Sequence, residues 1–240
     1  MPKQHLLKDI RTEAQSRIGK KIYADAPESQ KLLHEFGDKV AHDCGCMKVH
    51  GPIKTRERAE QKLADRLGGD WFEMRDTVRM TIIAPDMTAL RKVQATIRAG
   101  AVAHRGLGII RDFELLAKQS PCGYSGVNFA IRLQNGQAGE IQVNIPEVMY
   151  GQFAPEIFAG ILGKETAQKI RAAKGVEGGL GHPFYEIYRT GKSTPSGKQA
   201  ADLSTRYFEC LRSHSGSKAQ SQLVNEITAF RKDHPQVFDH

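Results

Sequence analysis

Two alternating segments, VNFAIRL at 127–133 and GEIQVNI at 139–145, constrain the fold most strongly. Polar and apolar residues alternate in both, which is typical of β-strands that bury one face. QNGQ at 134–137 lies between them and contains Asn-Gly, a strong turn signal between paired strands. The sequence therefore predicts a β-hairpin, so part of this chain must be a sheet.

One face of the second strand is unusually polar. Period-two geometry places Glu140, Gln142 and Asn144 together, whereas Ile141 and its alternating neighbours face the other way. A strand with an acid and two amides on one face either borders water or contributes to a binding site. The pattern of this strand alone leaves both interpretations open.

The remaining elements suggest alternation of strands and helices. TVRMTIIAP at 77–85 predicts a strand, and DMTALRKVQATIRAG at 86–100 predicts a helix that Asp86 caps and Gly100 ends. A further strand is predicted at 108–117. Helices are predicted at 3–22, 26–45 (with Pro27 at its start), 55–69, 146–175 and 181–214. The last range contains a breaker-rich linker, TGKSTPSGK at 190–198, and one more short helix and a polar tail are predicted in the final thirty residues.

This order favours an α/β fold. We expect a mixed sheet of about five strands, flanked by helices and resembling nucleotidyltransferases, with a helical C-terminal region. We expect three parts: N-terminal helices at 1–50 that pack on the core, the core itself at 51–190, and a helical extension with a tail at 191–240.

Charge and composition narrow the class of protein. The 240 residues carry a formal net charge of +8, which favours a polyanionic partner such as a nucleotide or a nucleic acid. Four scattered cysteines fit neither a disulfide framework nor a zinc site. The chain has no apolar run long enough to span a membrane and no signal peptide at its start, so we expect a soluble, cytoplasmic protein without a membrane partner.

A basic segment supplies candidate phosphate ligands. IKTRERAEQK contains Lys54, Arg56, Arg58 and Lys62, and in a helix Lys54, Arg58 and Lys62 would share one face. Such like charges are unfavourable unless an anion faces them. A solvated helix face, helped by nearby glutamates, is the alternative.

Two carboxylates complete a candidate site. Asp76 and Arg79 lie where a buried strand begins, and Glu140 lies on a second strand. Carboxylates on adjacent strands that face a basic helix would suit Mg²⁺ and a triphosphate. An internal ion pair between Asp76 and Arg79 is the alternative. Asp70 with Arg75 is a less favoured pair than Asp76 with Arg79, because Arg75 does not directly precede the apolar strand.

The ordered series IKTRERAEQK, MRDTVRMTII, GYSG and EIQVN resembles the synthetase domain of the RelA/SpoT family of alarmone synthetases. The resemblance covers roughly residues 48–150, and GY and EIQ are its most specific parts. Asn128 stands where the family often has histidine, and Asn144 where it often has arginine. In form, the motifs are most similar to the toxin and secreted-effector branches.

The resemblance implies a nucleotide-binding transferase, a bacterial kinase that moves the β,γ-diphosphate of ATP to the 3′-hydroxyl of a purine nucleotide. The products would be (p)ppApp- or (p)ppGpp-type alarmones made by a growth-inhibiting toxin or effector. Asp76 and Glu140 would be catalytic and bind Mg²⁺. The other implied roles are ATP binding by Lys54, Arg56, Arg58, Lys62 and Arg79, and acceptor binding by Tyr124, Asn128, Gln142 and Asn144.

Three questions stay open in the sequence. His182, Tyr185, Glu186 and Arg189 share one face of a predicted helix, which either closes the active site or packs within the protein. The acceptor is either a nucleotide or the tRNA 3′ end, which the positive charge would suit. The chain is either an enzyme, controlled by an antitoxin or immunity protein, or an inactive nucleotide-binding module.

Overall fold

The computed structural model describes residues 2–103, 106–114, 120–124, 126–213 and 217–238. Contacts divide the chain into two compact units, one of Met1–Phe113 with Asn128–Val143, the other of Glu114–Val127 with Asn144–His240. The division into three parts at residues 50 and 190 is a different partition and stays a prediction.

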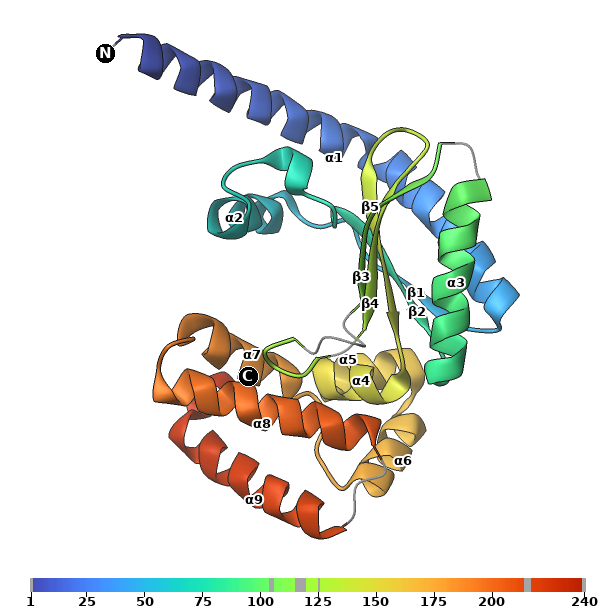
Figure 1. The fold of residues 1–240 in the computed structure, drawn as a ribbon, viewed down its shortest axis with the longest axis vertical. Coiled ribbons are helices and arrows are strands. Elements are labelled where there is room, and N and C mark those ends of the chain that lie inside the picture. Colours follow the sequence, from blue (N-terminus) through green and yellow to red (C-terminus); the bar gives the residue numbers. More distant parts are fainter. Residues whose placement is uncertain (1, 104–105, 115–119, 125, 214–216, 239–240) are drawn as a thin grey trace. The chain divides into compact units, whose positions relative to one another are not determined.

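The first unit contains the sheet, as predicted. The described residues form a five-stranded mixed sheet in the order β1-β2-β5-β4-β3, with helices on its flanks (Figure 1). The strands are β1 (Met47–His50), β2 (Val78–Ile83), β3 (Gly108–Glu114), β4 (Val127–Arg132) and β5 (Ala138–Asn144). The hairpin and both other predicted strands are confirmed; residues 115–117 of the strand expected at 108–117 lie outside the described residues.

The short strand β1 was not predicted. It pairs antiparallel with β2, with Met47 opposite Ile83 and His50 opposite Met80. Three of its four residues are exposed, so MKVH lacks the alternating burial that marks β5. Its position at the end of the strand order explains why its sequence carries no such pattern.

Side-chain alternation assigns the two faces of the sheet. Phe129, Ile131 and Ile141 are fully buried, and each such side chain contributes about 1.5–3 kcal/mol on burial. Helix α1 (Pro2–Cys44) covers this face: a Cβ at Gly139 would lie 3.0 Å from the Leu33 side chain. Helix α3 (Met87–Ala103) packs with α1 beside the sheet, and α2 (Arg56–Arg66) lies on the other side (Figure 1).

Two helix boundaries predicted from proline and glycine are wrong. One helix, α1, replaces the two predicted at 3–22 and 26–45, and Pro27 lies inside it. Side chains on both sides of Pro27 bind the β4–β5 turn, since Asn135 Nδ2 donates to Ser29 Oγ and Gln137 Nε2 to Asp25 Oδ2, both at 2.9 Å. These tertiary contacts hold the helix across the missing N–H of proline.

The second wrong boundary is Gly100. Asp86 does cap α3, because its Oδ1 accepts from the Ala89 N–H at 2.8 Å. The helix, however, continues past Gly100 to Ala103. A Cβ at Gly100 would lie 2.9 Å from the Phe36 ring, so this glycine permits close packing of α1 and α3 and is not a terminator.

The second unit is helical in its described part. Its core is aromatic, with Phe158, Phe184, Tyr207 and Phe208 almost fully buried. The helices are α4 (Pro146–Gln152), α5 (Pro155–Leu162), α6 (Lys164–Lys174), α7 (Gly181–Thr190), α8 (Pro195–Arg212), α9 (Ser217–Asp233) and α10 (Pro235–Phe238). The predicted helical C-terminal region is therefore confirmed. Among the described residues, no helix is long and apolar enough to cross a membrane.

Candidate active site

A charged cavity of about 280 Å³ lies in the first unit. Its lining combines arginine and lysine with three acidic side chains and comes from α2, the segment after it, and three strands. The lining residues are Lys62, Arg66, Leu67, Glu73, Arg75, Asp76, Arg111, Asn128, Ala130 and Glu140. This cavity contains both carboxylates predicted from the sequence.

The polar face of β5 lines this cavity. Because Gly139 and Ile141 face α1, Glu140 and Gln142 point to the other side of the sheet. Asn128 on β4 and Arg111 on β3 reach the same side by the same alternation. The polar face of the hairpin therefore borders a cavity, and its role in a functional site stays a prediction.

Asp76 is held by two lysines. Its Oδ2 lies 2.8 Å from Lys62 Nζ and 3.1 Å from Lys54 Nζ, and its side chain is only 13% exposed. Burial alone would raise the pKa of Asp76, but Lys62 and Lys54 outweigh it and hold the pKa below its ordinary 3.8. Asp76 is therefore ionised at neutral pH.

The expected helical face of Lys54, Arg58 and Lys62 does not exist, because α2 begins only at Arg56. Thr55 caps the helix by accepting from the Arg58 N–H at 3.4 Å. Lys54 precedes this cap in an extended segment, where its N–H donates to the Thr77 carbonyl at 2.8 Å. This pairing of backbones next to Asp76 brings the Lys54 ammonium to the carboxylate.

The other predicted cations divide. Arg79 is half-buried, and its positive charge lowers the pKa of Glu140. Asp76 forms its ion pairs with Lys54 and Lys62, and the described residues show none between Asp76 and Arg79. Arg56 and Arg58 lie on the exposed surface of α2, where Arg56 Nε contacts Glu60 Oε1 at 2.8 Å. The roles of Arg56 and Arg58 in ATP binding stay predictions.

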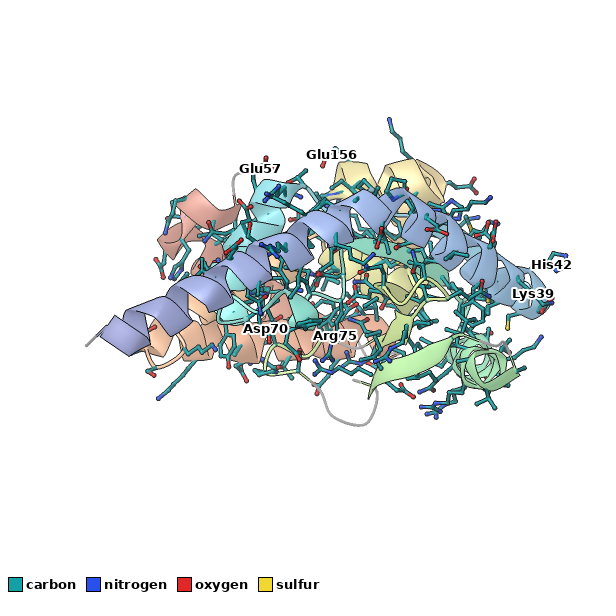
Figure 2. The ribbon with its side chains drawn as sticks, turned by 90° about the horizontal axis from the view of Figure 1, so that it is seen from above. Lys39, His42, Glu57, Asp70, Arg75 and Glu156 are labelled. Carbon is teal, nitrogen blue, oxygen red and sulfur yellow. The ribbon has the colours of Figure 1, made fainter. Side chains whose placement is uncertain are left out.

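The competing candidate Asp70 has a structural role. It caps the short 3₁₀ helix Trp71–Glu73 by accepting from the Phe72 N–H at 2.9 Å, and it also accepts from Gln15 Nε2. Arg75, labelled with Asp70 in Figure 2, lines the cavity and contacts Glu73 Oε2 at 2.7 Å. Asp76 lines the cavity and Asp70 does not, and the catalytic role of Asp76 stays a prediction.

Glu140 is the counterpart of Asp76 in the cavity. Burial raises the pKa of Glu140 and the charge of Asp76 adds to this, although Gln142 and the cations Lys62 and Arg79 act in the opposite direction. Gln142 Nε2 donates to Glu140 Oε1 at 2.6 Å. The carboxylate thus has one oriented oxygen and a raised proton affinity.

The opposite pKa shifts suit different tasks. A permanently ionised carboxylate suits a cation ligand, whereas one with a raised pKa suits a proton acceptor. Asp76 Oδ1 and Asn128 Oδ1 are both buried without a hydrogen-bond partner among the described residues. Such hard oxygens fit Mg²⁺. No group of three His, Cys, Asp or Glu ligands occurs in the described part of the chain.

The sequence analysis did not predict several cavity residues as phosphate ligands. Arg66 lies one helical turn after Lys62, Arg75 directly precedes Asp76, and Arg111 alternates onto the cavity face of β3. The first two could have been found by extending the Lys62 spacing and the Asp76 motif. Arg111 required knowledge of which face of β3 points to the cavity.

Tyr124 and Asn144, two predicted acceptor ligands, contact each other in the second unit. Tyr124 Oη donates to Asn144 Oδ1 at 3.1 Å. The loop before Tyr124 is fixed on α8, because Arg212 donates to the Gly123 carbonyl at 2.6 Å. Gly123 has φ +68°, and a Cβ there would lie 2.5 Å from the Thr205 Cα, so only glycine fits.

The predicted helical face of His182, Tyr185, Glu186 and Arg189 lies on α7. His182 and Glu186 line a second cavity of about 630 Å³ within the second unit, and Tyr185 is exposed. Arg189 Nε donates to Glu186 Oε2 at 3.1 Å. A role for this face in the active site stays a prediction.

Comparison with known proteins identifies the family. No family model matches the chain. The (p)ppApp synthetase toxin Tas1 of Pseudomonas aeruginosa is 33% identical over 199 residues, which are 82% of this chain. The chain spans only 43% of the length of that toxin.

Solved structures agree with this relative. In the crystal structure of the Type VI effector Tas1 with its immunity protein, the effector is 32% identical, with a TM-score of 0.69 over 80% of this chain and 95% of that chain. A small alarmone synthetase from Bacillus subtilis is 14% identical over 89% of this chain and 97% of its own, with a TM-score of 0.48. The identity and coverage of Tas1 confirm the resemblance, and the chain belongs to the RelA/SpoT-like family of alarmone synthetases.

Proposed function

We propose that the chain is a Mg²⁺-dependent pyrophosphokinase that transfers the β,γ-diphosphate of ATP to the 3′-hydroxyl of a purine nucleotide. The observation that carries this proposal is the pair of carboxylates in one cationic cavity, Asp76 with a lowered and Glu140 with a raised pKa. Transfer of a diphosphate from ATP to a hydroxyl group needs neutralisation of the phosphate charge, positioning of the two substrates and a proton acceptor for the hydroxyl. The cavity offers all three.

The cations of the cavity would bind the triphosphate. Lys54 and Lys62 donate to Asp76 in this structure, and phosphate oxygens would share their ammonium groups when ATP enters. Arg66, Arg75 and Arg111 also line the cavity, and planar guanidinium groups suit bidentate binding of phosphate. Together these groups would fix the β-phosphorus against the acceptor.

Glu140 would accept the proton of the attacking hydroxyl. The 3′-oxygen attacks the β-phosphorus, the bond to the bridging oxygen of the α-phosphate breaks, and AMP leaves with the electron pair. The hydrogen bond from Gln142 orients the receiving carboxylate. A raised pKa makes Glu140 a better proton acceptor than Asp76 near neutral pH.

Asp76 would hold the Mg²⁺ ion, and Glu140, whose first proposed role is to accept the proton, is the second candidate ligand. When bound, the cation neutralises charge that develops on the phosphate oxygens. Alarmone synthetases generally depend on a divalent metal, and the unpartnered Oδ1 of Asp76 supports a ligand at this position.

The acceptor is proposed to be an adenine nucleotide. Tas1 is named a (p)ppApp synthetase, and we extend that acceptor class to this chain. Tyr124 would stack on the base. Asn144 Oδ1 accepts a hydrogen bond from the Tyr124 hydroxyl and would keep the tyrosine ring oriented. Asn128 Oδ1, buried without a partner among the described residues, would accept a hydrogen bond from the acceptor.

The biological role is proposed by the same extension. Tas1 is a toxin and a Type VI effector that forms a complex with its immunity protein. We propose that this chain likewise inhibits growth from inside a target cell and is neutralised by an immunity protein. The net charge of +8 would favour an acidic neutralising partner.

An acceptor panel tests the proposed reaction. The protein is incubated with Mg²⁺ and γ-labelled ATP, and AMP, ADP, GDP, GTP or deacylated tRNA is offered in separate tubes. We expect label on adenine nucleotides in the wild type, and none in Glu140→Ala with a retained circular-dichroism spectrum.

Each other outcome has a defined meaning. Label on guanine nucleotides would correct the acceptor but keep the chemistry. Label on tRNA alone would overturn the nucleotide acceptor. A folded protein that binds ATP but labels nothing would be an inactive nucleotide-binding module.

A further inference from the structure

The segment of residues 51–55 carries Lys54 to Asp76, and two elements hold its backbone. On one side, the Gly51 N–H donates to the Arg79 carbonyl at 3.0 Å, and the Lys54 N–H donates to the Thr77 carbonyl at 2.8 Å. On the other, α1 supplies two side-chain donors, Gln30 to the Gly51 carbonyl and Tyr23 to the Lys54 carbonyl, both at 2.9 Å. The backbone of Lys54 is therefore held at both its N–H and its C=O.

The hydroxyl of Tyr23 lies at the junction of two lysine-bearing elements. It is also 3.1 Å from the carbonyl of Thr55, the residue that caps α2. The next turns of α2 carry Lys62, the second lysine on Asp76. One hydroxyl thus anchors the end of the Lys54 segment and the beginning of the Lys62 helix.

The ring of Tyr23 is itself fixed. It meets the Trp71 ring edge-on, with ring centroids 6.0 Å apart, and packs against a buried cluster formed by Ala59, Leu63, Trp71 and Met74. Burial raises the pKa of Tyr23, and the nearby charges of Glu57 and Glu60 raise it further. The phenol therefore stays protonated and able to donate near neutral pH.

We propose that Tyr23 is a positioning residue of the active site, whose hydroxyl holds Lys54 and the start of α2 so that both lysines stay on Asp76 and ready for the triphosphate. The expected effect on ATP binding rests on the proposed function. The anchoring of the backbone by Tyr23 rests only on the hydrogen bonds described above. Tyr23 touches none of the reacting groups. It lies on α1, outside the motifs at residues 48–150 that carry the family resemblance.

Tyr23→Phe isolates the hydroxyl, since the ring and its contact with Trp71 remain. The matched control is Tyr150→Phe in the second unit, where Tyr150 Oη donates to the Val176 carbonyl at 3.1 Å. Both variants remove a tyrosine hydroxyl that donates to the backbone. In Tyr23 it reaches the Lys54 and Thr55 carbonyls of the lysine segment, and in Tyr150 it reaches a carbonyl outside that segment.

Hydrogen exchange measures the anchoring without substrate. In Tyr23→Phe we expect amides in residues 51–58 to exchange about 3- to 10-fold faster, because a neutral hydrogen bond contributes about 0.5–1.5 kcal/mol. Tyr150→Phe should leave that segment unchanged. Wild-type exchange at residues 51–58 in Tyr23→Phe would overturn the inference, whatever the protein catalyses.

Calorimetric titration with Mg²⁺ and a non-hydrolysable ATP analogue measures the consequence. We expect Tyr23→Phe to raise the dissociation constant about 3- to 10-fold. In a Lys54→Ala background the same change should have a smaller effect, because only the contribution through Lys62 remains. Equal effects in both backgrounds would overturn the positioning role.

The two measurements separate the inference from the proposed function. A wild-type protein that binds no ATP analogue would defeat the proposed function, and the exchange measurement would still decide the anchoring. If the wild type binds the ATP analogue but the effects of Tyr23→Phe and Lys54→Ala on the dissociation constant are additive, only the inference about Tyr23 is refuted.

Discussion

The two cavity carboxylates, Asp76 and Glu140, should respond oppositely to loss of charge. Asp76→Asn removes the partner of two ammonium groups, whereas Glu140→Gln removes a buried charge that burial and Asp76 disfavour. Both variants should lose activity. Their free energies of unfolding should move in different directions, measured in EDTA to exclude metal binding.

The magnitude for Asp76 follows from burial. Breaking a fully buried ion pair costs about 3–5 kcal/mol, and an exposed pair about 0.2–1 kcal/mol. Lys54 and Asp76 are each 13% exposed, but Lys62 is 28% exposed and can turn toward water. We therefore expect Asp76→Asn to lower the unfolding free energy by about 2–3 kcal/mol, equivalent to about 4–12 °C in Tm for a chain of this size.

For Glu140 the sign depends on pH. Because its pKa is raised in the folded protein, the folded state binds this proton more tightly than the unfolded state does. The unfolding free energy of the wild type therefore falls as pH rises from the ordinary Glu value of 4.5 through the raised pKa. Glu140→Gln has no such titrating group. Its free energy of unfolding should therefore equal or exceed that of the wild type at neutral pH, and the difference should grow as pH rises from 4.5 through the raised pKa.

Urea unfolding of the wild type and both variants, at several pH values from about 5 to about 8, measures these differences. Added Mg²⁺ should stabilise only the wild type, since each variant lacks one proposed ligand. An Asp76→Asn variant as stable as the wild type, together with a destabilised Glu140→Gln variant, would refute this account of the two carboxylates.

Three further perturbations test other parts of the structure. Gln142→Leu removes a hydrogen bond that lowers the pKa of Glu140, so the acid limb of the kcat/KM profile should move to higher pH; an unmoved limb would exclude Glu140 as the base. Lys62→Met should raise KM for ATP about tenfold or more in steady-state kinetics. It should also lower the free energy of unfolding in urea by about 1–2 kcal/mol, because Asp76 loses one of its two ammonium partners. An unchanged KM would contradict phosphate binding by Lys62. Gly100→Ala should lower Tm because its Cβ meets an aromatic ring, whereas Gly160→Ala, with open space around it, should gain about 0.5–1 kcal/mol; equal shifts would contradict the packing argument.

The sheet and the carboxylate pair could be predicted because their signals are local. Alternation in β5 fixed which side Glu140 and Gln142 share, and the pattern holds since Ile141 is fully buried on the other face. The strand at 78–83 was equally clear because Arg79 and Thr81 alternate with buried apolar residues. The two-residue period of a β-strand was therefore sufficient to predict which side of the sheet carries Glu140 and Gln142.

Features set by tertiary contacts could not be predicted in this way. Pro27 and Gly100 have local preferences for helix ends, and contacts with the β4–β5 turn and with the Phe36 ring override them. The helical spacing of Lys54 failed because Thr55 caps α2 after it. Tyr23, 31 residues before its acceptor, has no local signal at all.

Phosphorus NMR of the reaction with ATP and ADP tests the central claim most directly. A pyrophosphokinase predicts that AMP and a new 3′-linked diphosphate appear in equal amounts, only with Mg²⁺, and not in Asp76→Asn or Glu140→Gln. Transfer of a single phosphate, release of free phosphate or pyrophosphate without a 3′-linked product, or unchanged turnover in both variants would contradict it.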